Sequence, residues 1–223
     1  MTRESFDLQL AHLQEDVLAL SSMVEEALLE SVENLKRRDI GASKLLIKRD
    51  KEIDSRRYAI ESDALTLIAT QQPMAGDMRR LAATLFIANE LERIGDYAKG
   101  LSRVNIRIGD EPLMKPLIDI PRMAELGQQM IHRAMEAFVQ RDVDLARAVV
   151  AEDEAVDALH DQIYAELITL LFQDVSKIRQ ANQLLMAAHN LERAADRATN
   201  ICERAIYSVT GQLIDYGWEN DLG

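Results

Sequence analysis

Apolar residues recur along most of the chain at spacings of three and four, which places them on one face of an α-helix. The first such stripe lies within residues 6–38 and consists of Leu10, Leu13, Val17, Leu20, Val24, Leu28 and Val32. It predicts one long amphipathic helix. A second helix is predicted after Asp39, its expected N-cap, and ends near residue 70. The next apolar stripe predicts a third helix over residues 77–108.

Turns are expected to be few, because the chain has only nine Gly and four Pro among 223 residues. The stretch 71–76 contains one of each and predicts the turn between the second and third helices. The other three prolines fall in residues 109–121, which we interpret as a linker. Beyond the linker, Asp142 is the expected N-cap of a fifth helix. Residues 172–175 predict a turn before a sixth helix, with Asp174 as its cap.

The two sides of the linker resemble each other in sequence. Leu91-Glu92-Arg93 with Asp96 recurs 100 residues later as Leu191-Glu192-Arg193 with Asp196. Asp50 with Asp54 recurs 103 residues later as Asp153 with Asp157. Internal duplication is the economical explanation. We therefore predict an all-α fold of six long helices, a tandem duplication of a three-helix bundle. The predicted domains are a first bundle in residues 1–108, a linker in 109–121 and a second bundle in 122–223.

Composition and charge narrow the class of protein. Apolar residues make up 48% of the chain and charged residues 29%, which suits a soluble domain with a packed core. The formal net charge of −12 argues against nucleic-acid binding, because phosphate contacts need a basic surface. No stretch approaches the roughly 18 consecutive apolar residues of a membrane span, and the charged start does not resemble a signal peptide. We expect a cytoplasmic protein without membrane insertion.

Eight carboxylates make up the candidate site. They form four pairs spaced four residues apart, which places the members of each pair on one helix face: Asp50/Asp54, Glu92/Asp96, Asp153/Asp157 and Glu192/Asp196. Residues equidistant from the turn of an antiparallel hairpin face each other. For a hairpin centred on residue 73, the first two pairs are level, and a hairpin centred at 174–175 aligns the other two. We therefore expect a first cluster (Asp50, Asp54, Glu92, Asp96) and a second cluster (Asp153, Asp157, Glu192, Asp196).

Four neighbouring carboxylates repel one another unless something neutralises them. The clusters could point apart into solvent, pair with the arginines Arg56, Arg57, Arg93 and Arg193, or bind cations. Oxygen ligands favour hard cations such as Mg, Ca, Mn or ferric iron, and Zn remains open. His160 lies near the second cluster in sequence, but a lone histidine on a charged helix is more often a surface residue. The single cysteine, Cys202, is expected to pack in the core.

The string Leu91-Glu92-Arg93-Ile94-Gly95-Asp96 resembles the PhoU family of phosphate-specific transport system accessory proteins. The preceding Gln72-Pro73, the string Asp77-Met78-Arg79 and the later Asn200-Ile201-Cys202-Glu203 also match that family, while the second copy, Leu-Glu-Arg-Ala-Ala-Asp, is weaker. The resemblance implies a duplicated three-helix bundle. It also implies multinuclear metal clusters on Asp50, Asp54, Glu92 and Asp96, and on Asp153, Asp157, Glu192 and Asp196, with Fe, Mg, Mn, Ca and Zn as candidate metals.

The same resemblance implies a regulatory role without enzymatic activity. Members of the family act in negative regulation of phosphate uptake and of the phosphate regulon. The implied partners are the ATPase subunit of a phosphate ABC transporter and the sensor histidine kinase of the phosphate regulon, with the protein as an adaptor between them. A homodimer is compatible with this role. The absence of a Walker A string, a nucleophile elbow and a Gly-rich phosphate cradle agrees with a protein that is not an enzyme.

Two other functions compete with this interpretation. A ferritin-like carboxylate-metal oxidase would need Glu-x-x-His motifs in a four-helix core, and none occurs; His189 and Glu192 stand in the reverse order. The other alternative is a helical adaptor without a functional metal, in which the acidic faces are solvated.

Overall fold

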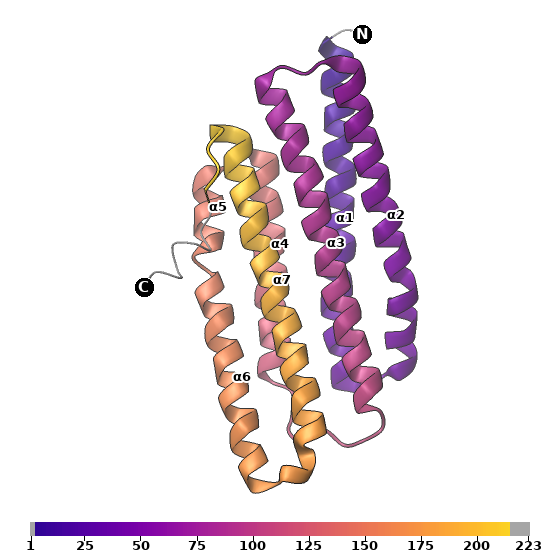
Figure 1. Cartoon of the computed structure of the whole chain (residues 1–223), viewed down its shortest axis with the longest axis vertical. Helices are drawn as coiled ribbons and strands as arrows, with labels where there is room; N and C mark the ends of the chain where they lie inside the picture. Colours follow the sequence, from indigo (N-terminus) through magenta and orange to yellow (C-terminus); the bar gives the residue numbers. More distant parts are fainter. Residues whose placement is uncertain (1–2, 215–223) are drawn as a thin grey trace.

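The computed structural model describes residues 3–214, and these residues are almost entirely helical (Figure 1). The α-helices are α1 (Arg3–Arg37), α2 (Ile40–Gln71), α3 (Ala75–Ile108), α4 (Asp119–Gln140), α5 (Val143–Val150), α6 (Asp153–Gln173) and α7 (Ile178–Thr210), and a short 3₁₀ helix, η1 (Val175–Lys177), precedes α7. No strand occurs within residues 3–214, so the predicted all-α class is confirmed. None of the described helices is long and apolar enough to cross a membrane.

The helices form two bundles that lie side by side (Figure 1). The first half consists of α1, α2 and α3, and the second of α4 to α7. The most extensive contact between the halves joins α3 to α7, and α1 also packs on α4. The buried apolar side chains form one cluster that includes members of both halves, such as Ile87 and Leu191. Because they share this core, the halves stabilise each other.

An approximate two-fold relation connects α3 and α7, which run antiparallel (Figure 1). The Glu90 carboxylate on α3 accepts a hydrogen bond from Asn200 Nδ2 on α7 at 3.0 Å. The duplicated counterparts of these two residues, Asn190 and Gly100, also meet, since a Cβ atom on Gly100 would lie 3.1 Å from Asn190 Nδ2. The halves therefore exchange equivalent contacts about an axis between α3 and α7.

The predicted caps and turns are largely confirmed. Asp39 accepts a hydrogen bond from Ala42 N at 2.8 Å and caps α2. Asp142 caps α5 in the same way, through Asp144 N and Leu145 N. In the first turn, Gln72 adopts the left-handed conformation and α3 begins at Ala75, two residues earlier than predicted. Asp174 caps the 3₁₀ turn that leads into α7.

The predicted fifth helix is broken into α5 and α6 by Ala151 and Glu152, which the sequence analysis did not foresee. Both residues keep helical φ angles but have ψ near −15°. The hydrogen-bond pattern tightens there, because Glu152 N bonds to Val149 O and Ala155 N to Glu152 O, three residues back. Glu152 also forms an ion pair with Arg133 of α4. The break places Asp153 at the first position of α6.

The linker is shorter than predicted, because α4 begins at Asp119. Residues from both halves form hydrogen bonds with the linker. Arg38, at the end of the first half's α1, donates hydrogen bonds to the carbonyls of Asp110 and Glu111 at 3.0 and 3.1 Å. Gln180 of α7 donates to Pro112 O at 2.9 Å and accepts from Met114 N. The ends of the two predicted domains, residues 1–2 and 215–223, lie outside the described residues.

Candidate functional site

Helices α2 and α3 bring the four carboxylates of the first cluster together. Burial raises the pKa of Glu92 above its ordinary value, and the negative charge of Asp96 adds to this effect. Asp54 and Asp50 act on the Glu92 pKa in the same direction, so all three aspartates lie within electrostatic reach of Glu92. Asp50 is buried, Asp54 and Glu92 are half-buried, and Asp96 is exposed. The four acids of the predicted first cluster are therefore neighbours.

A glycine controls the spacing of the helices beside the first cluster. A Cβ atom at Gly95 would lie only 3.1 Å from Ile53 Cδ1 and 3.2 Å from Ile53 Cγ2. The bare α-carbon at Gly95 thus lets α3 approach α2 closely. Ile53 and Gly95 each directly precede a cluster acid, Asp54 and Asp96. This contact lies at the level along the two helix axes where the pairs Asp50/Asp54 and Glu92/Asp96 are located.

The first cluster contains a cation that the sequence analysis missed. Lys99 Nζ donates hydrogen bonds to Asp50 Oδ2 at 2.5 Å and to Asp96 Oδ1 at 2.6 Å, bridging α2 and α3. Burial lowers the Lys99 pKa, but the two hydrogen bonds and the negative charges of Asp50 and Asp96 together outweigh this effect and raise the pKa. The signal in the sequence was the spacing of Lys99 three residues after Asp96, which places both on one helix face.

The arginines that the sequence offers as counter-charges interact with the cluster acids less directly than Lys99 does. Arg57 lowers the pKa of Glu92, against the larger effects that raise it. Arg56 pairs instead with Asp16 of α1, at 3.2 Å. In the second half, Arg193 Nη1 lies 3.5 Å from Asp196 Oδ2. Lys99 is therefore the principal cation of the first cluster.

Helices α6 and α7 bring the second cluster together. Burial is the largest of the causes that raise the pKa of Asp153 to about 7. The negative charges of Asp157, Asp196 and Glu192 follow, in that order. Burial also raises the pKa of Asp157, with Asp196 as the next cause. The four acids of the second predicted cluster therefore lie within electrostatic reach of Asp153 or Asp157.

Two oxygen atoms of the second cluster are buried without a hydrogen-bond partner, Asp153 Oδ1 and Glu192 Oε2. The position equivalent to Lys99 is Thr199, whose hydroxyl donates to the backbone carbonyl of Asp196 at 2.8 Å. Within residues 3–214, no lysine forms an ion pair with the four acids of the second cluster. The second cluster is therefore an acidic group without an ammonium inside it.

Two histidines flank the second cluster. His189 Nδ1 lies 3.0 Å from Glu192 Oε2 without the geometry of a hydrogen bond. His160, which the sequence analysis left out, lies close enough to Asp157 to lower its pKa. The centres of the two imidazole rings are 6.5 Å apart. Imidazoles beside carboxylates enlarge the range of metals that such a group could hold.

Neither cluster is preassembled as a metal centre. Among residues 3–214, no three His, Cys, Asp or Glu side chains are grouped so that they could hold an ion. The chemistry of the second cluster nevertheless suits a hard cation, because Asp153 and Glu192 have buried oxygens that accept no hydrogen bond. In the first cluster, the Asp50 and Asp96 oxygens already accept from Lys99. A metal ion would fit the second cluster better than the first.

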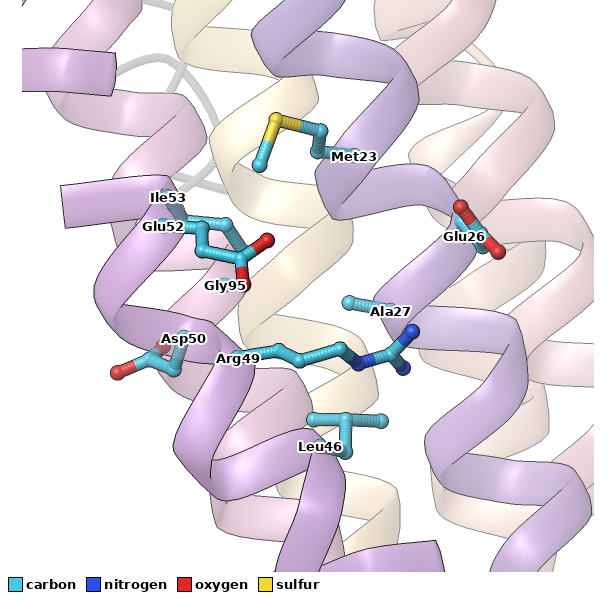
Figure 2. Close-up of a pocket in the computed structure, with 9 residues that line it drawn as sticks. All are labelled: Met23, Glu26, Ala27, Leu46, Arg49, Asp50, Glu52, Ile53 and Gly95. Atoms are coloured by element: carbon cyan, nitrogen blue, oxygen red, sulfur yellow. The ribbon is translucent and has the colours of Figure 1, made fainter. Parts of the chain in front are cut away.

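A small cavity lies between α1 and α2, on the other side of Asp50 (Figure 2). Its volume is about 100 Å³, and Met23, Ala27, Leu46 and Ile53 make its surface largely apolar. Figure 2 shows the Arg49 side chain extending across the cavity toward α1, while the Asp50 carboxylate points away from it. The cavity therefore borders the first cluster at Asp50, whose carboxylate does not point into it.

Comparison with known proteins places this geometry in context. The PhoU domain family matches the chain twice, over residues 17–104 and 120–205. Proteins named phosphate-specific transport system accessory protein PhoU homolog are similar: that of Clostridium acetobutylicum is 35% identical over 96% of this chain and 99% of its own length. The homolog from Aquifex aeolicus is 33% identical over 93% of this chain and 94% of its own length. The crystal structure of the phosphate transport system regulatory protein PhoU from Streptococcus pneumoniae superimposes with a TM-score of 0.87 and 29% identity, covering 94% of this chain and 99% of that one.

Proposed function

This chain belongs to the PhoU domain family, and on that premise we propose that it regulates phosphate uptake negatively, as an accessory protein of a phosphate-specific transport system. The observation that carries the proposal is the full-length similarity to accessory proteins of that name, in both halves of the chain. The acidic surface and the absence of nucleotide-binding motifs support a role in regulation and not in catalysis.

The proposed mechanism is that of an adaptor in the cytoplasm. The protein would join the ATPase subunit of a phosphate ABC transporter to a sensor histidine kinase and repress the phosphate regulon when phosphate is plentiful. Rigid helices with polar outer faces suit docking on other proteins. The helix hairpins also end in exposed apolar residues, Met74 between α2 and α3 and Phe172 at the end of α6. These ends support the proposal because they offer apolar contact area at both ends of the molecule.

The two carboxylate clusters are the proposed metal sites, with Asp50, Asp54, Glu92 and Asp96 in one and Asp153, Asp157, Glu192 and Asp196 in the other. A bound cation would neutralise the repulsion among the acids and join α2 to α3, or α6 to α7. The buried oxygens Asp153 Oδ1 and Glu192 Oε2, which accept no hydrogen bond, support this proposal. Oxygen donors favour Mg, Ca, Mn or ferric iron, while the neighbouring histidines keep Zn among the candidates.

The regulatory proposal is tested by deleting the gene and measuring a phosphate-starvation reporter in phosphate-rich medium. We expect the reporter to be derepressed, and expression of the intact chain from a plasmid to restore repression. An unchanged reporter in the deletion strain would contradict the proposal. The adaptor mechanism is tested separately, by measuring binding of the purified chain to the purified transporter ATPase subunit and to the cytoplasmic part of the kinase. Binding to neither would contradict the adaptor role.

A further inference from the structure

The duplicated halves keep their acids but differ in the basic residues beside them. At the position equivalent to Lys99 the second half has Thr199, 100 residues later. At the position equivalent to Arg57 it has His160, 103 residues later. Two permanent positive charges of the first half are thus replaced by a hydroxyl and an imidazole, while the second half has Arg197 at the position of Tyr97. This difference concerns the residues that neutralise the clusters, while all eight acids remain.

Lys99 lies where a bridging cation would lie in the first cluster. Its ammonium contacts one acid from each helix, Asp50 on α2 and Asp96 on α3, at 2.5 and 2.6 Å. The Asp50 side chain is only 7% exposed and that of Lys99 only 18%. A metal ion that reached Asp50 would have to displace the ammonium and would remain next to its positive charge. Both effects weaken binding of a second cation.

The second cluster has no such group inside it. Arg193 and Arg197 contact only one of its acids, Asp196, at the longer distances of 3.5 and 4.0 Å. Asp153 Oδ1 and Glu192 Oε2 are buried without a hydrogen bond, and two imidazoles lie beside the cluster. His189 Nδ1 is 3.0 Å from Glu192 Oε2, and His160 is close enough to Asp157 to lower its pKa. Neutral imidazoles can stay beside a metal ion or bind it, whereas an ammonium cannot.

We propose that Lys99 is a tethered counter-ion that takes the place of a metal ion in the first cluster, so that metal ions from solution bind at the second cluster alone. The inference rests on the proposed metal binding and narrows it to one half of the molecule. The α2–α3 hairpin is then joined permanently by a side chain of the protein. The α6–α7 hairpin is joined only when a metal ion is available, so the two halves respond differently to metal supply.

The test is binding of Mn²⁺ to the full chain after treatment with EDTA, measured by equilibrium dialysis. Wild-type protein is compared with Lys99→Thr, which copies the second half into the first, and with Thr199→Lys, which does the reverse. Lys36→Thr removes an exposed lysine that pairs with Glu33 and serves as the matched control. We expect Lys99→Thr to bind about twice as many Mn²⁺ ions as wild type. We expect Thr199→Lys to lower the affinity at least tenfold and Lys36→Thr to change neither quantity.

The outcomes separate this inference from the proposed function. If wild type and Lys99→Thr bind the same number of ions, Lys99 does not exclude metal and the inference is wrong. If Thr199→Lys binds as tightly as wild type, the inference is wrong as well. If no variant binds Mn²⁺, Zn²⁺ or ferrous iron, the proposed metal sites themselves are wrong. Far-UV circular dichroism checks whether each variant is folded, and the Thr199→Lys result stands even if Lys99→Thr does not fold.

Discussion

The two halves share a backbone plan and the same four acids, yet the charges of those acids are balanced differently. In the first half Asp50 lies in the middle of the continuous helix α2 and is bonded to Lys99. Its counterpart Asp153 is the first residue of α6, directly after a helix break, and has an oxygen without a partner. Duplication of the acids therefore does not by itself give two sites with the same chemistry. A single neighbouring position, Lys99 or Thr199, changes the chemistry of the whole cluster.

The largest effect is expected from removing Lys99 in metal-free protein. Lys99→Met removes the ammonium that bridges the buried Asp50 carboxylate to Asp96. Because one partner of a buried ion pair is lost, unfolding free energy should fall by about 3 kcal/mol. The counterpart change, Thr199→Val, should cost less than about 1 kcal/mol. Urea unfolding in EDTA measures both values, and equal losses would contradict the difference between the clusters.

The next effect is expected at the contact between the halves. Glu90 accepts hydrogen bonds from Arg197 Nη1 at 3.2 Å and from Asn200 Nδ2 at 3.0 Å. Glu90→Ala leaves the largely buried Arg197 without this partner and should cost about 2–3 kcal/mol of unfolding free energy. The counterpart Asn190→Ala removes no charge pair, so we expect a loss of about 1 kcal/mol. Urea unfolding compares the two, and a larger loss for Asn190→Ala would overturn the expectation.

The third effect concerns pH and the second cluster. The Asp153 pKa is about 7 in the folded protein against an ordinary value of 3.8, so the folded state holds its proton more tightly than the unfolded state. Metal-free wild type should therefore lose stability as pH rises from about 4 to about 7. The charged groups that face Asp153 are Asp157, Glu192 and Asp196, with His160 and His189 nearby.

The variant Asp153→Asn should lack this part of the pH dependence, which is on the order of 1 kcal/mol after allowance for solvent screening. The control is Asp144→Asn, which removes a carboxylate that is 95% exposed on α5. Thermal unfolding between pH 4 and pH 8 gives the difference between each variant and wild type. If the stability of Asp153→Asn changes with pH in the same way as that of wild type, the pKa of Asp153 is not raised in the folded protein.

The smallest effect is expected where α1 and α4 end. Arg38 and Arg141 occupy equivalent positions and both adopt left-handed backbone, with φ of 56° and 59°. Arg141→Gly should raise stability by about 0.5–1 kcal/mol, because glycine adopts this conformation without strain. Arg38→Gly should gain little, since it also loses the hydrogen bonds to the linker carbonyls. Thermal unfolding compares the two; an equal rise would mean that the linker contacts contribute nothing.

The sequence predicted the helical hairpins well and placed the paired acids in the same neighbourhood, for a physical reason. Regular apolar spacing and the caps at Asp39 and Asp142 determine where long helices lie, and antiparallel neighbours align residues equidistant from their turn. Lys99 was missed because its role depends on how a flexible four-carbon side chain reaches across to α2. Its position three residues after Asp96 was visible, but its choice of partner was not.

The break between α5 and α6 was also beyond sequence reasoning. Ala151 and Glu152 both favour helices, so propensity argues against a break there. The tightened turn arises in the folded structure, where Glu152 pairs with Arg133 of α4. The packing of α3 on α7 was likewise not predicted, because it depends on contacts between residues about 100 positions apart. The predicted domains and metal ligands remain predictions for experiment.

The most direct test of the difference between the clusters is a crystal structure of the full chain soaked in Mn²⁺, with anomalous scattering measured at the manganese edge. If metal ions bind at the second cluster alone, we expect anomalous peaks between α6 and α7, next to Asp153 and Glu192, and no peak between Asp50 and Asp96. Peaks of equal height at both clusters, or a peak at the first cluster alone, would contradict this expectation.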